Sequence, residues 1–170
     1  MCGPTIYDGV PIYGRVPKTE EPDPIVETVK EKPGFKAYTI HGITPPKEWQ
    51  KALYRELERN GIAWYMPYAV CQIFQESRWN QYADSGKGDQ GITQQKAIYW
   101  SSRAARFGAK GASIWDVQAQ FKVYAGMMAA YLKAANGDIG WALSYYFYGS
   151  GQRADKYVSD VLSHLPYLAR

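Results

Sequence analysis

The stretch Ile73-Phe74-Gln75-Glu76-Ser77-Arg78-Trp79-Asn80 decides how the rest of the chain is interpreted. It ends a segment from Pro67 to Trp79 that is predicted to be a helix, because Pro suits the first helical position and buried-type residues recur every three or four positions. The face they form consists of Val70, Ile73, Phe74 and Ser77. Glu76 is therefore expected to lie among apolar side chains.

A carboxylic acid in such a place can act as a proton donor. Burial disfavours the charged form, so the pKa of Glu76 is expected to rise from about 4.3 to roughly 6–7. At neutral pH the side chain then carries a transferable proton, which a general acid requires. An isolated Glu in a helix is more often a solvated surface residue, so the helix alone does not assign this role.

The residues that follow Glu76 strengthen the assignment. Ser77 comes next, then a glycine-punctuated loop with Ala83 and Ser85, and then Gly91-Ile92-Thr93-Gln94. In their order and spacing these residues resemble the catalytic motif of the lytic transglycosylases of the soluble lytic transglycosylase (SLT) type. That motif has a Glu-Ser pair at a helix end, a loop, and a Gly-Leu-Met/Thr-Gln turn.

Two further segments resemble the same family. Ala142 to Gly151 is similar to its Ala-Tyr-Asn-Ala-Gly segment, and Tyr157-Val158 with Val161 is similar to its terminal Tyr-Val element. The resemblance covers roughly residues 45–165. Phe147 stands where the family usually has Asn, Gln81 where Pro is common, and Asp89-Gln90 in place of a small residue.

The resemblance implies an all-α, lysozyme-like domain. Together with the helical periodicity it predicts about six helices in residues 44–170, behind an arm or linker in residues 1–43. Six of the ten prolines lie in residues 1–33, interleaved with charged residues. This composition is typical of an extended arm or tether, and we expect residues 1–33 to contribute little to folding.

The resemblance also implies a reaction. The family cleaves the β-1,4 bond between N-acetylmuramic acid and N-acetylglucosamine in peptidoglycan and leaves a 1,6-anhydro sugar, with one Glu acting first as acid and then as base. Glu76 would be that residue. The glycan would be positioned by Ser77, Gln94, Tyr146 and Tyr157. For Gln94 alone, a structural role in the first turn of a helix is the competing interpretation.

Two other classes of function stay open. A hydrolytic muramidase on the same scaffold would use Asp84 or Asp89 to activate water, since glycoside hydrolysis ordinarily needs two carboxylates. A non-catalytic component of a virion or secretion machine would bind the glycan in the same groove without cleaving it. Phe147, where the family usually has Asn, favours this third class.

The amino-acid composition limits the classes of ligand that the protein is expected to bind. The 15 Tyr and 6 Trp can line a groove that suits sugars, although most such rings fill cores. The net charge of +4 falls in residues 64–170, which favours an anionic polymer, but no basic run points to nucleic acid. Two His and two Cys without clustering predict no metal or cofactor, and Cys71 is expected to be a buried hydrophobe.

Boundary signals predict the remaining elements. Residues 35–43 are a short strand or an extended lead-in, and Thr44 caps a helix that Asn60-Gly61 ends. Thr93 caps a helix to Gly108, Ser113 with Asp116 forms a capping box for a long central helix to Asn136, and Asp138 caps a helix to Tyr148. The last helix is predicted over 155–165.

The sequence indicates an envelope location indirectly. No apolar stretch approaches the length of a transmembrane helix, and no signal peptide is visible in this chain. Because the family that the chain resembles acts on peptidoglycan, we nevertheless expect the protein in the bacterial cell envelope (periplasm) or on a virion. The N-terminal arm would link it to a larger assembly.

Overall fold

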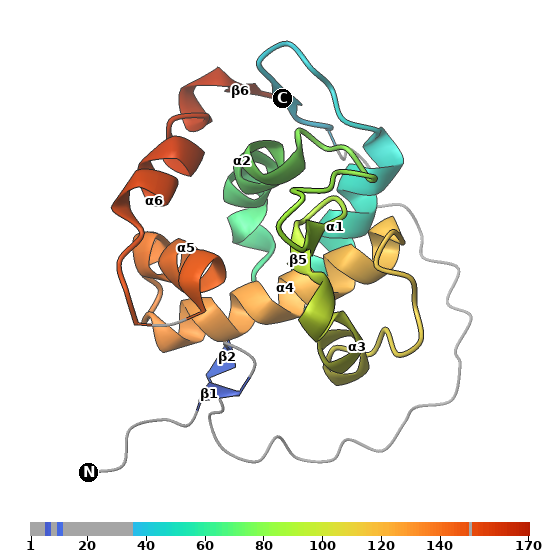
Figure 1. Ribbon diagram of the computed structural model, residues 1–170. Coiled ribbons are helices and arrows are strands. Elements are labelled where there is room, and N and C mark those ends of the chain that lie inside the picture. The colour runs from blue at the N-terminus through green and yellow to red at the C-terminus, as the bar shows by residue number, and fades with distance from the viewer. Residues whose placement is uncertain (1–5, 8–9, 12–35, 150) are drawn as a thin grey trace.

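The computed structural model describes residues 6–7, 10–11, 36–149 and 151–170 (Figure 1). Helices dominate this part of the chain, and the strands are only two residues long. The predicted all-α fold is thus confirmed. Its six α-helices within the described residues are α1 Lys47–Arg59, α2 Met66–Ser77, α3 Ala97–Arg106, α4 Val117–Ala134, α5 Ile139–Tyr148 and α6 Asp155–Leu162.

Three antiparallel strand pairs supplement the helices. β3 (Thr39–Ile40) pairs with β6 (Leu168–Ala169), so that the start of the domain is joined to its C-terminus. β4 (Asp89–Gln90) pairs with β5 (Gln95–Lys96) in the loop after α2. In the arm, β1 (Ile6–Tyr7) pairs with β2 (Val10–Pro11) beside α4. The expectation for the rest of residues 1–33 lies outside the described residues.

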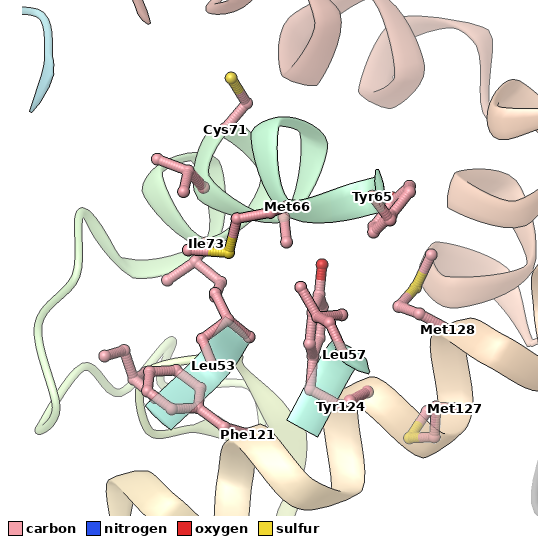
Figure 2. Packing of buried hydrophobic residues seen from close by; sticks show 14 of the residues in the cluster. Leu53, Leu57, Tyr65, Met66, Cys71, Ile73, Phe121, Tyr124, Met127 and Met128 are labelled. Atoms are coloured by element: carbon pink, nitrogen blue, oxygen red, sulfur yellow. The ribbon is translucent and has the colours of Figure 1, made fainter. Parts of the chain in front are cut away.

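Helix α4 is the centre of the core, as its wide apolar stripe predicts. Twelve of its 18 residues are buried, and it packs against α1 on one side and α5 on the other. Gly126 permits the approach of α3, because a Cβ there would meet the ring of Phe107 at 2.3 Å. Figure 2 shows side chains of α1, α4 and α2 meeting in this core, which also contains the buried Cys71.

Three predicted helix starts were wrong, because other hydrogen-bond partners occupy the side chain or another residue provides the cap. Thr44 does not cap α1, which begins after Pro46, and instead exchanges a 2.7 Å hydrogen bond with Thr39. Thr93 does not cap α3, which begins only at Ala97. The cap of α4 is Asp116 rather than Ser113.

Of two further boundaries, one agrees with the prediction and one differs. Asp138 caps α5 as predicted, since it accepts a hydrogen bond from the Trp141 amide at 2.8 Å. Helix α6 ends at Leu162, earlier than predicted, and a 3₁₀ turn at Leu165–Tyr167 follows before β6. The short turn lets the chain reach β3 and close the domain.

Candidate functional site

The end of α2 is held in an unusual backbone conformation. Arg78 and Trp79 both have positive φ, 52° and 63°, although neither is glycine. Such left-handed residues cost on the order of 1 kcal/mol each and persist only where packing enforces them. Trp79 supplies that packing: it is buried, contacts the ring of Phe121 edge-on, and donates from Nε1 to the Val70 carbonyl at 3.3 Å. The chain therefore turns sharply just after Glu76.

Glu76 lies in the last turn of α2 with part of its surface still accessible. The pKa of its carboxyl group is raised to about 7: burial raises it, a hydrogen bond from the Tyr157 hydroxyl to Oε1 opposes the rise, and the Asp89 charge adds to it. The value lies at the upper end of the range that the sequence predicts. At neutral pH the protonated and the ionised forms of Glu76 are therefore both well populated.

A buried hydrogen-bond network supports Glu76 from behind; we call it the Gln72 network. Gln72 donates from Nε2 to the Tyr157 hydroxyl at 3.1 Å. Its Oε1 accepts from the hydroxyls of Tyr124 at 2.7 Å and Tyr65 at 3.2 Å. Figure 2 shows the hydroxyl of Tyr124 pointing from α4 toward α2. Four elements, α2, α4, α6 and the 3₁₀ turn Ala63–Tyr65, thus meet behind one carboxylate.

Ser77 attaches the loop over residues 80–96 to the end of α2, and Gln94 holds the loop together from within. Ser77 is buried and donates to the Ile92 carbonyl at 2.7 Å. Gln94, with a φ of 49°, donates from Nε2 to the carbonyls of Ala83 at 3.0 Å and Gly91 at 2.9 Å. Both side chains therefore fix the shape of the loop, and their contact with a glycan stays a prediction.

A second network, the Thr93 network, holds the far side of the loop. Thr93 donates from its amide and its hydroxyl to Oε1 of the buried Gln120, at 2.7 and 2.8 Å. Tyr146 donates to the Thr93 carbonyl at 2.5 Å and accepts from Gln95 at 2.8 Å. Gly91 is required beside Gln120, because a Cβ would lie 1.8 Å from its Nε2. Thr93 is thus a tertiary contact and not a helix cap.

Two carboxylates of the loop differ from Glu76 in their surroundings. Asp84 is exposed, and hydrogen bonds from the Gly86 amide and Gln90 hold its pKa below the ordinary value. Asp89 forms an ion pair with Lys96 at 2.7 Å. Asp116 and Asp138 are both occupied at helix starts, Asp138 as the predicted cap of α5 and Asp116 as the cap of α4 in place of Ser113.

An exposed aromatic ring lies on Tyr157, the tyrosine that is hydrogen-bonded to Glu76. Phe147, at the end of α5, stacks on the buried ring of Tyr157 with centroids 4.7 Å apart and 27° between the planes. Phe147 is 54 % exposed to solvent, and the neighbouring Tyr148 is also exposed. The residue that departs from the family pattern therefore covers the tyrosine whose hydroxyl contacts Glu76.

The predicted site residues fall into two groups: Tyr157 and Tyr146 lie close to Glu76, whereas Ser77 and Gln94 are hydrogen-bonded to the loop over residues 80–96. Tyr157 contacts Glu76 directly, and Tyr146 lies close enough for the Glu76 charge to help burial raise its pKa. Sequence reasoning missed Gln72 and Gln120. A signal existed for both, since each is an amide on an otherwise apolar helix face, and a buried amide needs hydrogen-bond partners.

Neither a metal centre nor a membrane span was found in the part of the chain that the structure describes. No group of three or more His, Cys, Asp or Glu side chains there could hold a metal ion. None of the helices in the same residues is both long and apolar enough to cross a bilayer.

Comparison with known proteins gives one informative result. A protein-family model described as the transglycosylase SLT domain matches residues 52–161. The match runs from within α1 to the end of α6, one residue short of its last, and includes Glu76 with both networks. Neither the curated proteins nor the solved structures gave a match.

Proposed function

Because the chain belongs to the transglycosylase SLT domain family, we propose that it is a peptidoglycan lytic transglycosylase with Glu76 as its single catalytic carboxylic acid. It would cleave the β-1,4 bond between N-acetylmuramic acid and N-acetylglucosamine and leave 1,6-anhydro-N-acetylmuramic acid. The observation that carries the proposal is the state of Glu76, whose pKa burial raises to about 7.

The proposed reaction uses Glu76 twice. Protonated Glu76 first gives its proton to the glycosidic oxygen as the bond from that oxygen to the muramic C1 breaks. The substrate's N-acetyl group supports the positive charge at C1. Ionised Glu76 then takes the proton of the muramic 6-hydroxyl while the oxygen of that hydroxyl bonds to C1. The acid is regenerated, and no water is consumed.

A pKa near neutrality suits both halves of this cycle. A carboxyl group with an ordinary pKa near 4.3 would be almost wholly ionised at pH 7 and a poor acid. A carboxyl group with a much higher pKa would be protonated at pH 7 but would give up its proton less readily, and would therefore also be a poor acid. Burial against the opposing Tyr157 hydrogen bond gives Glu76 an intermediate value.

We assign the predicted glycan-positioning residues different tasks. Tyr157 would orient the carboxyl group of Glu76, to which it is hydrogen-bonded. Ser77, Gln94 and Tyr146 would shape the wall of the site through the loop over residues 80–96, to which each is hydrogen-bonded. Peptidoglycan lies outside the cytoplasm, so the site of action would be the cell envelope or a virion entering it.

One observation favours a second candidate, a hydrolytic muramidase. The charge of Asp89 raises the pKa of Glu76, so two carboxylates influence the same site. Asp89 or Asp84 would then activate a water molecule. Against this, Asp89 is paired with Lys96, and the hydrogen bonds that Asp84 accepts make it a weak base.

Product analysis tests the proposal. Purified peptidoglycan is digested with the intact protein, and the muropeptides are examined by mass spectrometry. Anhydro ends, lighter by one water than hydrolysis products, support the transglycosylase. Ordinary reducing ends point to the muramidase, and a lack of any cleavage, with glycan binding retained, to the non-catalytic interpretation.

A further inference from the structure

The buried amide of Gln72 lies between three tyrosine hydroxyls, and its orientation in the structure sets the direction of each hydrogen bond. An amide oxygen only accepts hydrogen bonds and an amide nitrogen only donates them. Oε1 of Gln72 faces two hydroxyls, those of Tyr65 and Tyr124, and Nε2 faces the hydroxyl of Tyr157. Tyr65 and Tyr124 therefore each direct their single hydroxyl hydrogen at Gln72.

The same accounting fixes the hydroxyl of Tyr157. Its oxygen accepts from Gln72, so its own hydrogen is free to go to the other neighbour, Oε1 of Glu76. The reverse orientation of Gln72 would place its oxygen against Tyr157 and take up that hydrogen. It would also require Glu76 to donate to Tyr157. The orientation of one amide thus decides which way the Tyr157–Glu76 hydrogen bond points.

From this geometry we infer that Gln72 is a positioning residue: by orienting the Tyr157 hydroxyl toward Oε1 of Glu76, it leaves Oε2 as the oxygen that carries the transferable proton. A proton on Oε1 would meet the hydrogen of Tyr157. The inference rests on the proposed function for its catalytic meaning, but the hydrogen-bond direction itself can be tested without activity.

The arrangement has a measurable consequence. A hydroxyl that accepts one hydrogen bond becomes a better donor of another. Gln72 therefore strengthens the bond that stabilises ionised Glu76, and its removal should raise the pKa of Glu76. It would also allow protonated Glu76 to donate to Tyr157, which acts in the same direction.

The direct test is titration of Glu76 by NMR of isotope-labelled glutamate carboxyl groups, with the signal assigned by its absence in Glu76→Gln. Tyr157→Phe should raise the pKa of Glu76 by about one unit, because a hydrogen bond to a charged group is lost. Gln72→Met should raise it by roughly half a unit. In the double variant the second change should add nothing, since Gln72 acts through Tyr157.

Gln50→Met is the matched control. Gln50 is likewise a fully buried amide on a helix, with bonds to Tyr38 and to the Pro45 carbonyl, and it belongs to neither network. It should lower stability without moving the titration of Glu76. Should Gln72→Met fail to fold, Gln72→Met/Tyr124→Phe removes a stranded hydroxyl together with its acceptor.

Two results would overturn the inference: a shift in Gln72→Met no larger than in Gln50→Met, or a full additional shift in the Tyr157→Phe background. The pH profile of wall lysis should follow the NMR titration. An intact protein that shows the NMR shifts but cleaves no peptidoglycan would contradict the proposed function and leave the positioning role standing.

Discussion

Glu76 and the loop carboxylates Asp84 and Asp89 carry the same chemical group in opposite surroundings. Glu76 is partly enclosed at a helix end, and burial raises its pKa to about 7. Asp84 is exposed and accepts two hydrogen bonds that lower its pKa. Asp89 is paired with a lysine. The comparison teaches that desolvation makes an acid, whereas hydrogen-bond donors and counter-charges make stable anions.

The substitution Glu76→Gln should have the largest effect. Gln is close to isosteric, can still accept from Tyr157, and cannot transfer a proton. General acid catalysis is typically worth 10²–10⁴-fold, and here one group serves as acid and base, so we expect a loss of about 10⁴-fold or more. A zymogram and product quantification measure it, with circular dichroism to verify folding. Turnover comparable to the unaltered protein would remove Glu76 from the mechanism.

The pH dependence should follow the acid. The step that needs protonated Glu76 slows as pH rises through about 7, because the protonated fraction then declines. Well above that value the loss should approach roughly tenfold per pH unit. The initial rate of wall lysis at constant ionic strength measures this. A rate that stays level from pH 7 to 9 would contradict the assignment.

The loop carboxylates should matter far less. Asp84→Asn and Asp89→Asn should each reduce the rate by less than about tenfold and preserve anhydro products, since neither is asked to transfer a proton. Asp89→Asn should also move the pH profile down, because the Asp89 charge raises the pKa of Glu76. If either variant is as damaged as Glu76→Gln, the contrast between the two regions fails and the muramidase is favoured.

Stability should show the same contrast on a smaller scale. The pKa of Glu76 in the folded state, about 7, is higher than the ordinary glutamate value of 4.5, so the folded protein binds more protons between these two pH values. The free energy of unfolding should therefore fall as pH rises through this window. Glu76→Gln should remove this loss, which is worth about 1–3 kcal/mol.

The measurement is the melting temperature of both proteins at pH 4 and pH 8. Glu76→Gln should melt higher than the unaltered protein at pH 8 and close to it at pH 4. An equal difference at both pH values would show that desolvation of the charge is not the cause.

Chelation should have the smallest effect of all. Wall lysis should survive an excess of chelator, because the proposed reaction moves a proton between Glu76 and the sugar without a Lewis acid. The rate is compared with and without chelator, and then after a divalent ion is restored. Loss and recovery would show that lysis requires a metal ion and would contradict the proposed reaction.

Local pattern was sufficient to predict that the helices exist and that Glu76 ends an apolar one. The spacing of Val70, Ile73 and Phe74 makes one face of α2 apolar wherever that helix is packed, and Glu76 at its end is drawn into the same environment. The long stripe of α4 likewise requires burial. These features depend on residues three or four positions apart, which a helix always brings together.

Capping predictions failed because a hydroxyl or a carboxylate can satisfy more than one partner. Thr93 has the composition of a cap, yet its hydroxyl and amide both bond to Gln120, 27 residues further along. Ser113 gives way to Asp116, whose carboxylate accepts from the amides of Gln118 and Ala119. A local motif allows such a bond, and competition with other partners, nearby or distant in the sequence, decides whether it forms.

By itself the sequence determined that a carboxylic acid ends an apolar helix and is followed by the loop and turn of a known family. Tertiary structure alone decided what that acid contacts. Tyr157 lies 81 positions away and Tyr124 lies 52 positions from Gln72. Folding brings these hydroxyls to one buried amide, and the donor and acceptor count at that amide gives the hydrogen bond to Glu76 its direction.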